Sequence, residues 1–196
     1  MPLIGLSGGI GSGKSVVARI LRCMGFPVYD CDSEARRIMA SDAGIHKFLC
    51  GRIHPLAVVD GVIDRQKVSE VVFSDSAALK ALNSIVHSAV FDDISRWCKG
   101  YDENAILFVE SAILRSSGLV RMVDAEWRVM APEEERIVRV IRRSGLSRRE
   151  VLARIEAQNS EDRFVEKDSG CPTFIINNSS SDAVLPQIHS LLSHYI

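Results

Sequence analysis

Short apolar runs alternate with longer amphipathic stretches along the first part of the chain. Residues 3–6 form an apolar run of strand length, and apolar positions then recur on one helical face between 14 and 24. A second short run at 26–29 and a helical stretch through 34–39 follow. This order predicts a β-α-β unit, which is typical of a parallel sheet covered by helices.

Residues 32–104 differ from this pattern because they read as helical, with no strand signal comparable to those on either side. Asp42 and the pair Ser74-Asp75 predict helix N-caps, and Asp60-Gly61 predicts a turn before a helix that runs to Phe73. The longest expected helix carries an apolar stripe at steps of three or four residues: Leu79, Leu82, Val86, Val90, Ile94 and Trp97. We expect a helical insertion between strands.

Strand signals return in the second half of the chain. The apolar run 105–109 is typical of a buried central strand, and it ends at Glu110. Further strands are expected at about 127–130 and 174–176. Helices are expected after Pro132, after the capping box from Ser147 to Glu150, and from about Asp182.

A glycine-rich segment lies between the first strand and the first helix. Residues 8–15 fulfil the pattern G-x-x-x-x-G-K-[ST] of a P-loop. In such a loop backbone N–H groups converge on phosphate oxygens, Lys14 adds a positive charge, and the Ser15 hydroxyl can ligate Mg²⁺. A glycine-rich anion-binding turn without a nucleotide is the alternative, but the strand before and the helix after favour a nucleotide site. We therefore expect ATP and Mg²⁺ to bind.

The elements together predict an α/β protein with the three-layer P-loop NTPase fold and a parallel sheet. Residues 1–31, 105–132 and 171–196 are expected to form the nucleotide-binding core. The helical insertion 32–104 is expected to bind the acceptor, and residues 133–170 are expected to form a helical lid.

Composition limits the classes of partner. The chain has 196 residues, of which 46% are hydrophobic and 25% charged, and its net charge is −1. We therefore expect one folded domain, or one core carrying small insertions, and no bulk nucleic-acid binding. Neither an apolar run of membrane-spanning length nor a signal-peptide pattern is visible. The five cysteines are scattered without a C-x-x-C pair, which fits reduced thiols. We expect a cytoplasmic monomer or small homo-oligomer that binds small molecules.

Two carboxylates are candidates for chemistry at the ends of strands. Asp32 follows the second expected strand, whose end we expect beside the P-loop, and it is suited to orient or deprotonate an acceptor hydroxyl. The alternative role is a helix N-cap, for which Asp32 or Ser33 is suitable, and the two roles are compatible. Glu110 ends the central strand, so its side chain is expected to point toward the nucleotide crevice.

Arginines crowd the two expected helices of the lid. A guanidinium binds phosphate oxygens bidentately, so one or two of them are expected to reach ATP, although a solvated charged face is the usual interpretation of such a run. Spacing does not choose among Arg136, Arg139, Arg142, Arg143, Arg148, Arg149 and Arg154. His87 lies next to the apolar stripe, and taken alone it is better explained as a structural histidine.

Several motifs resemble, in the same order, those of the dephospho-coenzyme A kinase family, and the likeness covers nearly the whole chain. The P-loop form Gly-Gly-Ile-Gly-Ser-Gly-Lys at 8–14 is more specific than the general pattern. The other matching segments are Asp30-Cys31-Asp32, Asp60-Gly61 with Asp64-Arg65 and Val72-Phe73, Leu82 to His87, the lid residues Arg139, Arg143 and Gln158, and Asn178. The resemblance implies that ATP phosphorylates the ribose 3′-hydroxyl of dephospho-coenzyme A, giving coenzyme A and ADP, while the helical insertion clamps the acceptor.

The resemblance also implies roles for individual residues. Those implied to be catalytic are Asp32, Lys14 and Arg143. The nucleotide would be bound by Gly9, Ile10, Gly11, Ser12, Gly13, Lys14, Ser15, Val16, Arg139 and Asn178, with Ser15 also on the metal. The acceptor would be bound by Asp32, Arg65, His87 and Glu110.

The chain departs from the family's motifs at a few positions. The segment Ala112-Ile113-Leu114-Arg115-Ser116 stands where the family has Pro-Leu-Leu-Phe-Glu. Single-residue departures are Val16, Ser88, Ser144 and Ser180. Because the P-loop and Asp32 are intact, we expect an active enzyme.

Three alternatives to this function remain. The first is another small-molecule or nucleoside monophosphate kinase on the same scaffold, and the second is an inactive homologue. The third is a nucleotide-dependent switch, which is disfavoured because the chain has no Asn-Lys-x-Asp motif and no Asp-x-x-Gly motif after the third strand.

Overall fold

The computed structural model describes residues 1–165 and 170–195, except for the side chains of 160–165. The expected lid, 133–170, therefore includes a stretch, 166–169, that lies outside the described residues. Among the helices that the structure describes, none is both long and apolar enough to cross a membrane.

The chain divides into two compact units. One consists of Met1–Asp30 with Tyr101–Ile196, and the other is Cys31–Gly100. The sequence pattern predicts 32–104 for the helical unit, so the structural unit starts and ends slightly earlier. We call the first the nucleotide unit, because it contains the P-loop, and the second the helical unit.

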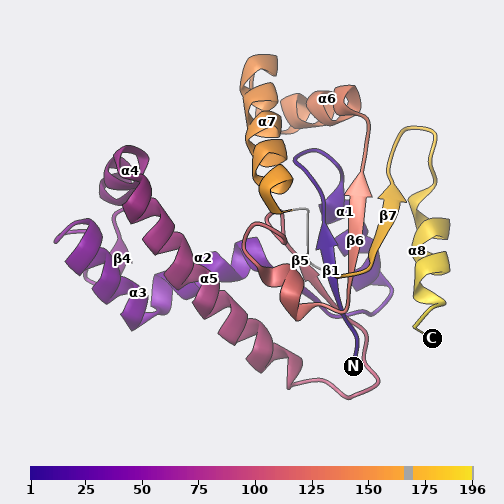
Figure 1. Ribbon diagram of the computed structural model, residues 1–196, viewed down its shortest axis with the longest axis horizontal. Helices are drawn as coiled ribbons and strands as arrows, with labels where there is room; N and C mark the ends of the chain where they lie inside the picture. Colours follow the sequence, from indigo (N-terminus) through magenta and orange to yellow (C-terminus); the bar gives the residue numbers. More distant parts are fainter. Residues whose placement is uncertain (166–169, 196) are drawn as a thin grey trace. The chain divides into compact units, whose positions relative to one another are not determined.

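The nucleotide unit is built on a five-stranded sheet in which every pairing is parallel (Figure 1). In chain order the strands are β1 (Leu3–Ser7), β2 (Val28–Asp30), β5 (Leu107–Glu110), β6 (Ala125–Met130) and β7 (Thr173–Asn177). Their order across the sheet is β2-β5-β1-β6-β7. The expected α/β class and the parallel sheet are confirmed.

Strand β5 lies between β2 and β1, since Val109 of β5 is in register with both Tyr29 and Gly5. The second strand is therefore not a direct neighbour of the P-loop strand, and the expectation that it ends beside the P-loop stays a prediction. Hydrophobic periodicity identifies strands, but their order depends on how the crossover connections fold. As a result Glu110, at the end of β5, lies on a strand directly next to β1.

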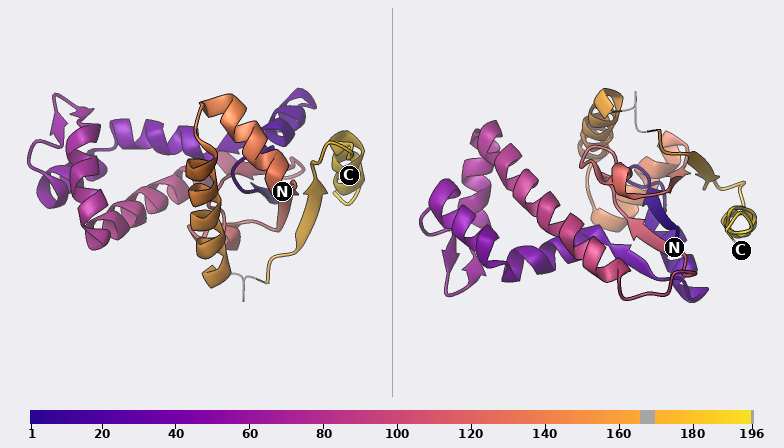
Figure 2. Two further views of the ribbon diagram at one scale, coloured as in Figure 1. Left: turned by 90° about the horizontal axis from the view of Figure 1, so that it is seen from above. Right: turned by 60° about the horizontal axis from the view of Figure 1, so that its bottom comes forward.

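The core of the nucleotide unit lies between the sheet and two helices. Helix α1 (Lys14–Cys23) packs on β1, β2, β5 and β6, and helix α8 (Val184–Leu192) lies beside β7, as two further views show (Figure 2). The largest buried side chains include Phe108 and Trp127, whose rings meet edge to face at 5.1 Å. On the other sheet face Leu114 and Val123 pack so closely over Gly5 that a Cβ there would lie 2.7 Å from Leu114.

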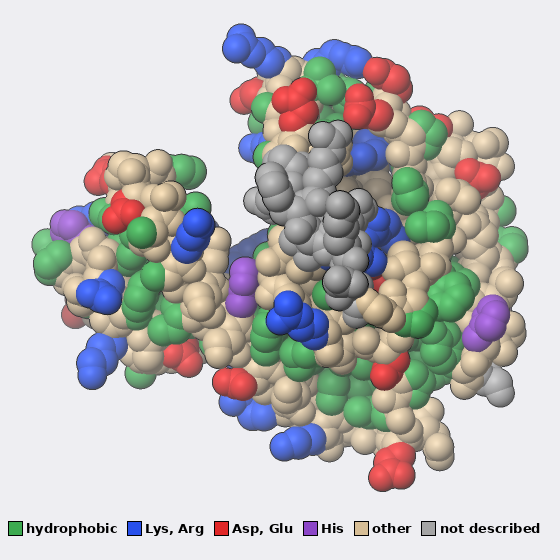
Figure 3. Space-filling model, in the orientation of Figure 1, with side chains coloured by type: hydrophobic (Ala, Val, Ile, Leu, Met, Phe, Trp, Pro, Cys, Tyr) green, Lys and Arg blue, Asp and Glu red, His purple; other side chains and the backbone are tan. Residues whose placement is uncertain are grey.

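Helices α6 (Glu133–Ser144) and α7 (Arg148–Val165) fall in the segment that is expected to form a lid, and we call them the lid for that reason. They have an apolar cluster of their own. Gly145, at φ 68°, ends α6 in a left-handed conformation that glycine adopts without strain. The expected capping box at the start of α7 is confirmed, because Ser147 and Glu150 exchange hydrogen bonds. On the outer surface of the lid, at the top of Figure 3, side chains of both charges are mixed.

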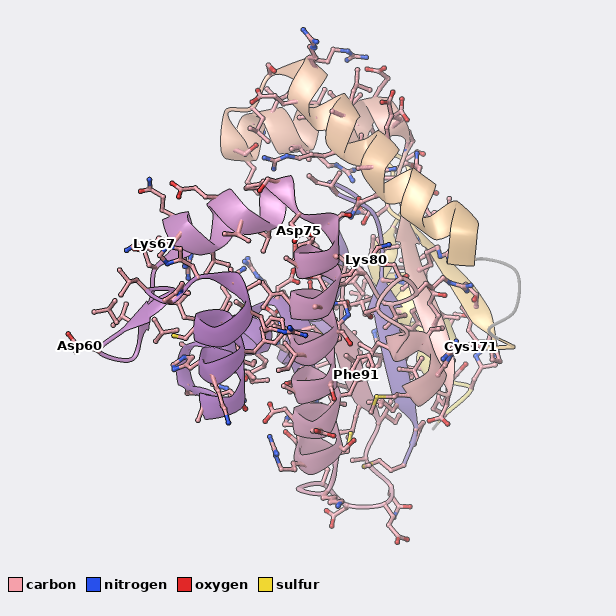
Figure 4. All side chains as sticks on the ribbon, turned by 60° about the vertical axis from the view of Figure 1, so that its left-hand side comes forward. Asp60, Lys67, Asp75, Lys80, Phe91 and Cys171 are labelled. Carbon is pink, nitrogen blue, oxygen red and sulfur yellow. The ribbon has the colours of Figure 1, made fainter. Side chains whose placement is uncertain are left out.

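The helical unit contains helices α2 (Cys31–Ser41), α3 (Ala43–Phe48), α4 (Arg65–Ser74) and α5 (Ser76–Cys98), with a π-helical turn at Leu49–Ile53. The N-caps at Asp42 and Asp75 are confirmed, since each carboxylate accepts backbone N–H groups of the helix that follows. Figure 4 shows Asp75 at the start of α5.

Three details of the helical unit differ from expectation. Helix α2 already begins at Cys31, so Asp32 is not its N-cap but lies in its first turn, where a carboxylate is also favourable. Strands β3 (Val58–Val59) and β4 (Val62–Ile63) form a short hairpin that the helical pattern did not indicate, with Asp60 at its tip (Figure 4). Leu79, the first residue of the expected apolar stripe, is 39% exposed.

Candidate functional site

The P-loop follows β1 directly and leads into α1. Two of its glycines are required by the space around them as well as by their backbone conformation. Gly11 has φ 77°, and a Cβ there would lie 2.6 Å from the backbone oxygen of Arg136. Gly13 has φ 94°, and its Cβ would collide with the amide of Asn178. Any larger residue would therefore displace the loop or the segments packed on it.

Both backbone polar groups of Ile10, in the middle of the P-loop, are held by lid side chains. Gln158 of α7 accepts a 2.7 Å hydrogen bond from the Ile10 N–H. Arg136 of α6 donates a 2.9 Å hydrogen bond from Nε to the Ile10 carbonyl. The Ile10 side chain packs against the apolar cluster of the lid, so loop and lid are connected by polar and apolar contacts together.

A third clamp comes from the segment after β7. Asn178 donates from Nδ2 to the Ser12 carbonyl at 2.7 Å, and its own carbonyl accepts from Arg139 at 2.8 Å. Arg139 also pairs with Glu135 at 2.8 Å. The structure thus brings Arg139 and Asn178, both expected at the nucleotide, together beside the loop. Arg143 lies one turn further along α6 and is exposed.

Three buried polar atoms around the P-loop have no hydrogen-bond partner in the described part of the chain. They are Ser12 Oγ, Arg136 Nη2 and Arg139 Nη1. Buried polar groups are normally paired, so a group of unpaired donors indicates a missing acceptor. Burial lowers the pKa of Arg136 somewhat, but a guanidinium remains charged at any physiological pH. An anion such as a phosphate group fits these donors.

The P-loop lysine is paired with the acid of the neighbouring strand. Lys14 Nζ lies 2.8 Å from Glu110 Oε1, and the two side chains are only 14% and 6% exposed. Arg22 of α1 approaches the other oxygen of Glu110 at 3.7 Å. Because a lysine ammonium has three donors, it can keep Glu110 and still reach a phosphate oxygen. In this structure the direct contact of Glu110 is therefore with Lys14.

Ser15 and Val16 lie in the first turn of α1, directly after Lys14, and both are exposed. The described residues contain no group of three or more His, Cys, Asp or Glu side chains that could hold a metal ion. Mg²⁺ in nucleotide sites is usually held by one or two protein oxygens, water and the substrate's phosphates, so a single exposed hydroxyl at Ser15 fits such an ion.

The remaining expected site residues belong to the helical unit. Asp32 lies in the first turn of α2, and Arg65 is the first residue of α4, directly after the N-cap Asp64. His87 lies on α5, stacks on Phe91 with ring centroids 6.5 Å apart, and has a pKa lowered by burial. Their roles toward an acceptor stay predictions.

A cavity of about 290 Å³ adjoins the start of the P-loop within the nucleotide unit. Its wall includes Gly8 and Gly9 of the loop and, from elsewhere, Arg115, Ser116, Glu126, Arg128 and Arg136. Glu126, on β6, is 1% exposed, and sequence reasoning did not single it out. A sequence signal for Glu126 was present, because Glu126 and Arg128 are charged residues in a strand whose other residues are typical of a buried strand.

Glu126 is the centre of a charged network. Its Oε1 accepts from Ser7 at 2.5 Å and from Arg128 at 3.2 Å, and its Oε2 accepts from Arg115 at 2.8 Å and from Thr173 at 3.3 Å. Burial alone would raise the pKa of Glu126, but the hydrogen bonds from Arg115 and Ser7 and the charge of Arg128 outweigh it, so the pKa lies below its usual value.

Comparison with known proteins agrees with a P-loop site of this kind. The family model "Dephospho-CoA kinase" matches residues 2–183. A Bacteroides fragilis dephospho-CoA kinase is 35% identical over 190 residues, which is 97% of this chain and 91% of that protein. A Thermus thermophilus dephospho-CoA kinase is 39% identical over 183 residues, covering 91% and 84%.

The fold has a close counterpart among solved structures. A crystal structure of a Thermus thermophilus protein superimposes with a TM-score of 0.79 at 36% identity, covering 98% of this chain and 97% of that one. The family match extends over the P-loop, the helical unit and the lid helices alike. This chain therefore belongs to the dephospho-CoA kinase family, and it is a kinase of the P-loop type.

Proposed function

We propose that this enzyme transfers the terminal phosphate of ATP to the ribose 3′-hydroxyl of dephospho-coenzyme A, giving coenzyme A and ADP. The observation that carries the proposal is the cluster of buried donors without partners around the P-loop: Ser12 Oγ, Arg136 Nη2 and Arg139 Nη1. Such donors stabilise the negative charge of a nucleotide's phosphates without reorganisation during the reaction.

The nucleotide unit supplies the donor side of the reaction. The P-loop amides from Gly9 to Val16 cradle the phosphates of ATP, and Lys14 neutralises their charge while Glu110 holds its amine. Arg139 and Asn178 support the loop, and Arg143 closes over the phosphates from the end of α6. Ser15 would hold Mg²⁺, which when bound neutralises charge on the phosphate oxygens.

The acceptor side rests on residues of the helical unit together with Glu110. Asp32 accepts the proton of the 3′-hydroxyl. The oxygen of that hydroxyl bonds to the terminal phosphorus of ATP, and the bond from this phosphorus to the oxygen of the leaving ADP breaks. Arg65 and His87 bind the acceptor, and Glu110 is the acid that pairs with the P-loop lysine. His87 is half-buried and largely neutral near pH 7, so it acts as a hydrogen-bonding or stacking group rather than a cation.

An acceptor panel tests the proposal. Purified protein, ATP and Mg²⁺ are combined with dephospho-coenzyme A, with nucleosides and with nucleoside monophosphates, and ADP formation is followed. Turnover with dephospho-coenzyme A well above the other acceptors supports the proposal. Turnover only with another acceptor identifies a different small-molecule kinase, and no turnover with any acceptor identifies an inactive homologue.

A further inference from the structure

Glu135, in the first turn of α6, has no role in the function proposed above, yet its carboxylate holds side chains and backbone from two parts of the nucleotide unit. Its Oε2 accepts a 2.8 Å hydrogen bond from Nη2 of Arg139, one turn further along the same helix. Its Oε1 accepts from the backbone N–H and from the hydroxyl of Ser180, each at 3.2 Å, in the loop after β7. Because a guanidinium and a backbone N–H can only donate, both oxygens of residue 135 must accept.

The contacts of Arg139 fix the orientation of its guanidinium group. Nη2 carries two hydrogens and has two acceptors, Oε2 of Glu135 and the carbonyl of Asn178, both at 2.8 Å. A planar group that is held in this way at one nitrogen has its other nitrogens fixed in direction. The other terminal nitrogen, Nη1, is buried and has no hydrogen-bond partner among the described residues. Glu135 therefore helps to set the direction in which this buried donor points.

The same contacts connect the lid helix α6 with the P-loop. Asn178 donates to the Ser12 carbonyl at 2.7 Å, and Ser180, two residues further on, is held by Glu135. Ser180 stands where the motif of the family has glycine, which offers an N–H but no hydroxyl. The hydroxyl bond to Glu135 is therefore a feature that this chain has beyond the family motif.

We propose that Glu135, supported by Ser180, is a positioning residue that directs Nη1 of Arg139 to a phosphate group of ATP. The proposal deepens the proposed function and rests on it for the identity of the anion, a nucleotide phosphate. Glu135 carries the same sign of charge as the phosphates. An acid that did not act through Arg139 would therefore disfavour nucleotide binding, and its neutralisation would strengthen binding. A positioning role has the opposite consequence, because neutralisation of Glu135 weakens binding.

The test is a calorimetric titration with the non-hydrolysable β,γ-imido analogue of ATP and Mg²⁺, which needs neither acceptor nor turnover. In Glu135→Gln the amide nitrogen must face either Arg139 or the N–H of Ser180, donor against donor, so the guanidinium loses its fixed orientation. We expect the dissociation constant to rise about fivefold or more. The matched control is Glu134→Gln, which removes the same charge from the same turn of α6, where Glu134 pairs with Arg148 at the exposed surface of the lid. This control is expected to leave the dissociation constant nearly unchanged.

A double-mutant cycle separates positioning from a purely structural role. In an Arg139→Met background the group that Glu135 orients is absent, so Glu135→Gln is expected to leave the dissociation constant nearly unchanged. Ser180→Ala removes one hydrogen bond to Glu135 at an exposed residue and serves if Glu135→Gln does not fold. It is expected to raise the dissociation constant about threefold in the wild-type background and to have no effect in Arg139→Met.

Two results overturn the positioning role. One is unchanged or tighter binding of the analogue by Glu135→Gln, or by Ser180→Ala where that variant replaces it. The other is a loss of affinity that is equal in the wild-type and Arg139→Met backgrounds. Wild-type protein that does not bind the analogue refutes the proposed function itself, which separates the two failures.

Discussion

Lys14 Nζ lies 2.8 Å from Glu110 Oε1, so the amine of the P-loop lysine is positioned by the acid at the end of β5, the strand next to β1. The pair is mostly shielded from water, where loss of one partner leaves the other charge poorly compensated. This contact connects the start of α1, directly after the P-loop, with the end of β5.

Glu110→Gln is expected to reduce kcat/KM for ATP about tenfold and to lower the free energy of unfolding by about 2 kcal/mol, because the amine of Lys14 loses its charged anchor. The control is Glu134→Gln, whose carboxylate pairs with Arg148 on the exposed surface of the lid. This control is expected to leave activity and stability nearly unchanged. Equal effects of the two variants would contradict a special role for Glu110.

Asp32→Asn tests the proposed base. The amide keeps the size of the side chain but cannot accept the proton of the acceptor hydroxyl, so kcat is expected to fall about 100-fold or more while ATP binding and stability persist. Asp42→Asn is the matched control, because asparagine caps α3 as well as aspartate does. Unimpaired turnover of Asp32→Asn would leave Asp32 with a structural role only.

A comparison of Gly11→Ala with Gly25→Ala separates the effect of backbone strain on ATP binding from the effect of a steric clash of the added Cβ. Both glycines have positive φ, 77° and 92°, so each alanine costs about 1 kcal/mol in strain. Only at Gly11 does the added Cβ meet a neighbour, the backbone of Arg136, whereas Gly25 has nothing within 4 Å. We expect the KM for ATP to rise about tenfold or more in Gly11→Ala and to stay unchanged in Gly25→Ala. Matching KM values would show that the close packing of lid and loop is unimportant.

The Glu126 network predicts a defined acid sensitivity. The pKa of Glu126 is lower in the folded protein than its usual value of 4.5, so its stabilising contribution is complete above about pH 4.5 and is lost as the pH falls through the folded pKa. Urea unfolding of the wild type and of Arg115→Met with Glu126→Gln is compared between pH 7 and pH 3. The wild type is expected to lose more stability than the variant on acidification. A difference that does not depend on pH would contradict the assigned network.

Local features were predictable from the sequence, because each depends on residues close together in the chain. The caps at Asp42 and Asp75, the P-loop and the capping box at Ser147 are of this kind. Strand order was not predictable in this way. Nor were the clamps on Ile10, because Arg136 and Gln158 are 126 and 148 residues away from it.

The site was predictable to the extent that its residues belong to a motif. Arg139 and Asn178 lie beside the P-loop as the family resemblance implies, but Arg136, which spacing alone did not distinguish from the other lid arginines, makes the direct contact with the loop. Glu126 was missed because charged residues in a buried strand form no sequence pattern that identifies their partners, although the position of Glu126 and Arg128 in such a strand was a signal.

The most direct test of the central claim is the identity of the product. Dephospho-coenzyme A is converted to completion with ATP and Mg²⁺, and the product is analysed by phosphorus and proton NMR. The account predicts coenzyme A, with one new phosphate monoester on the 3′-oxygen of the ribose and one ADP formed for each. A phosphate on any other oxygen, or ADP formation without a phosphorylated acceptor, would contradict it.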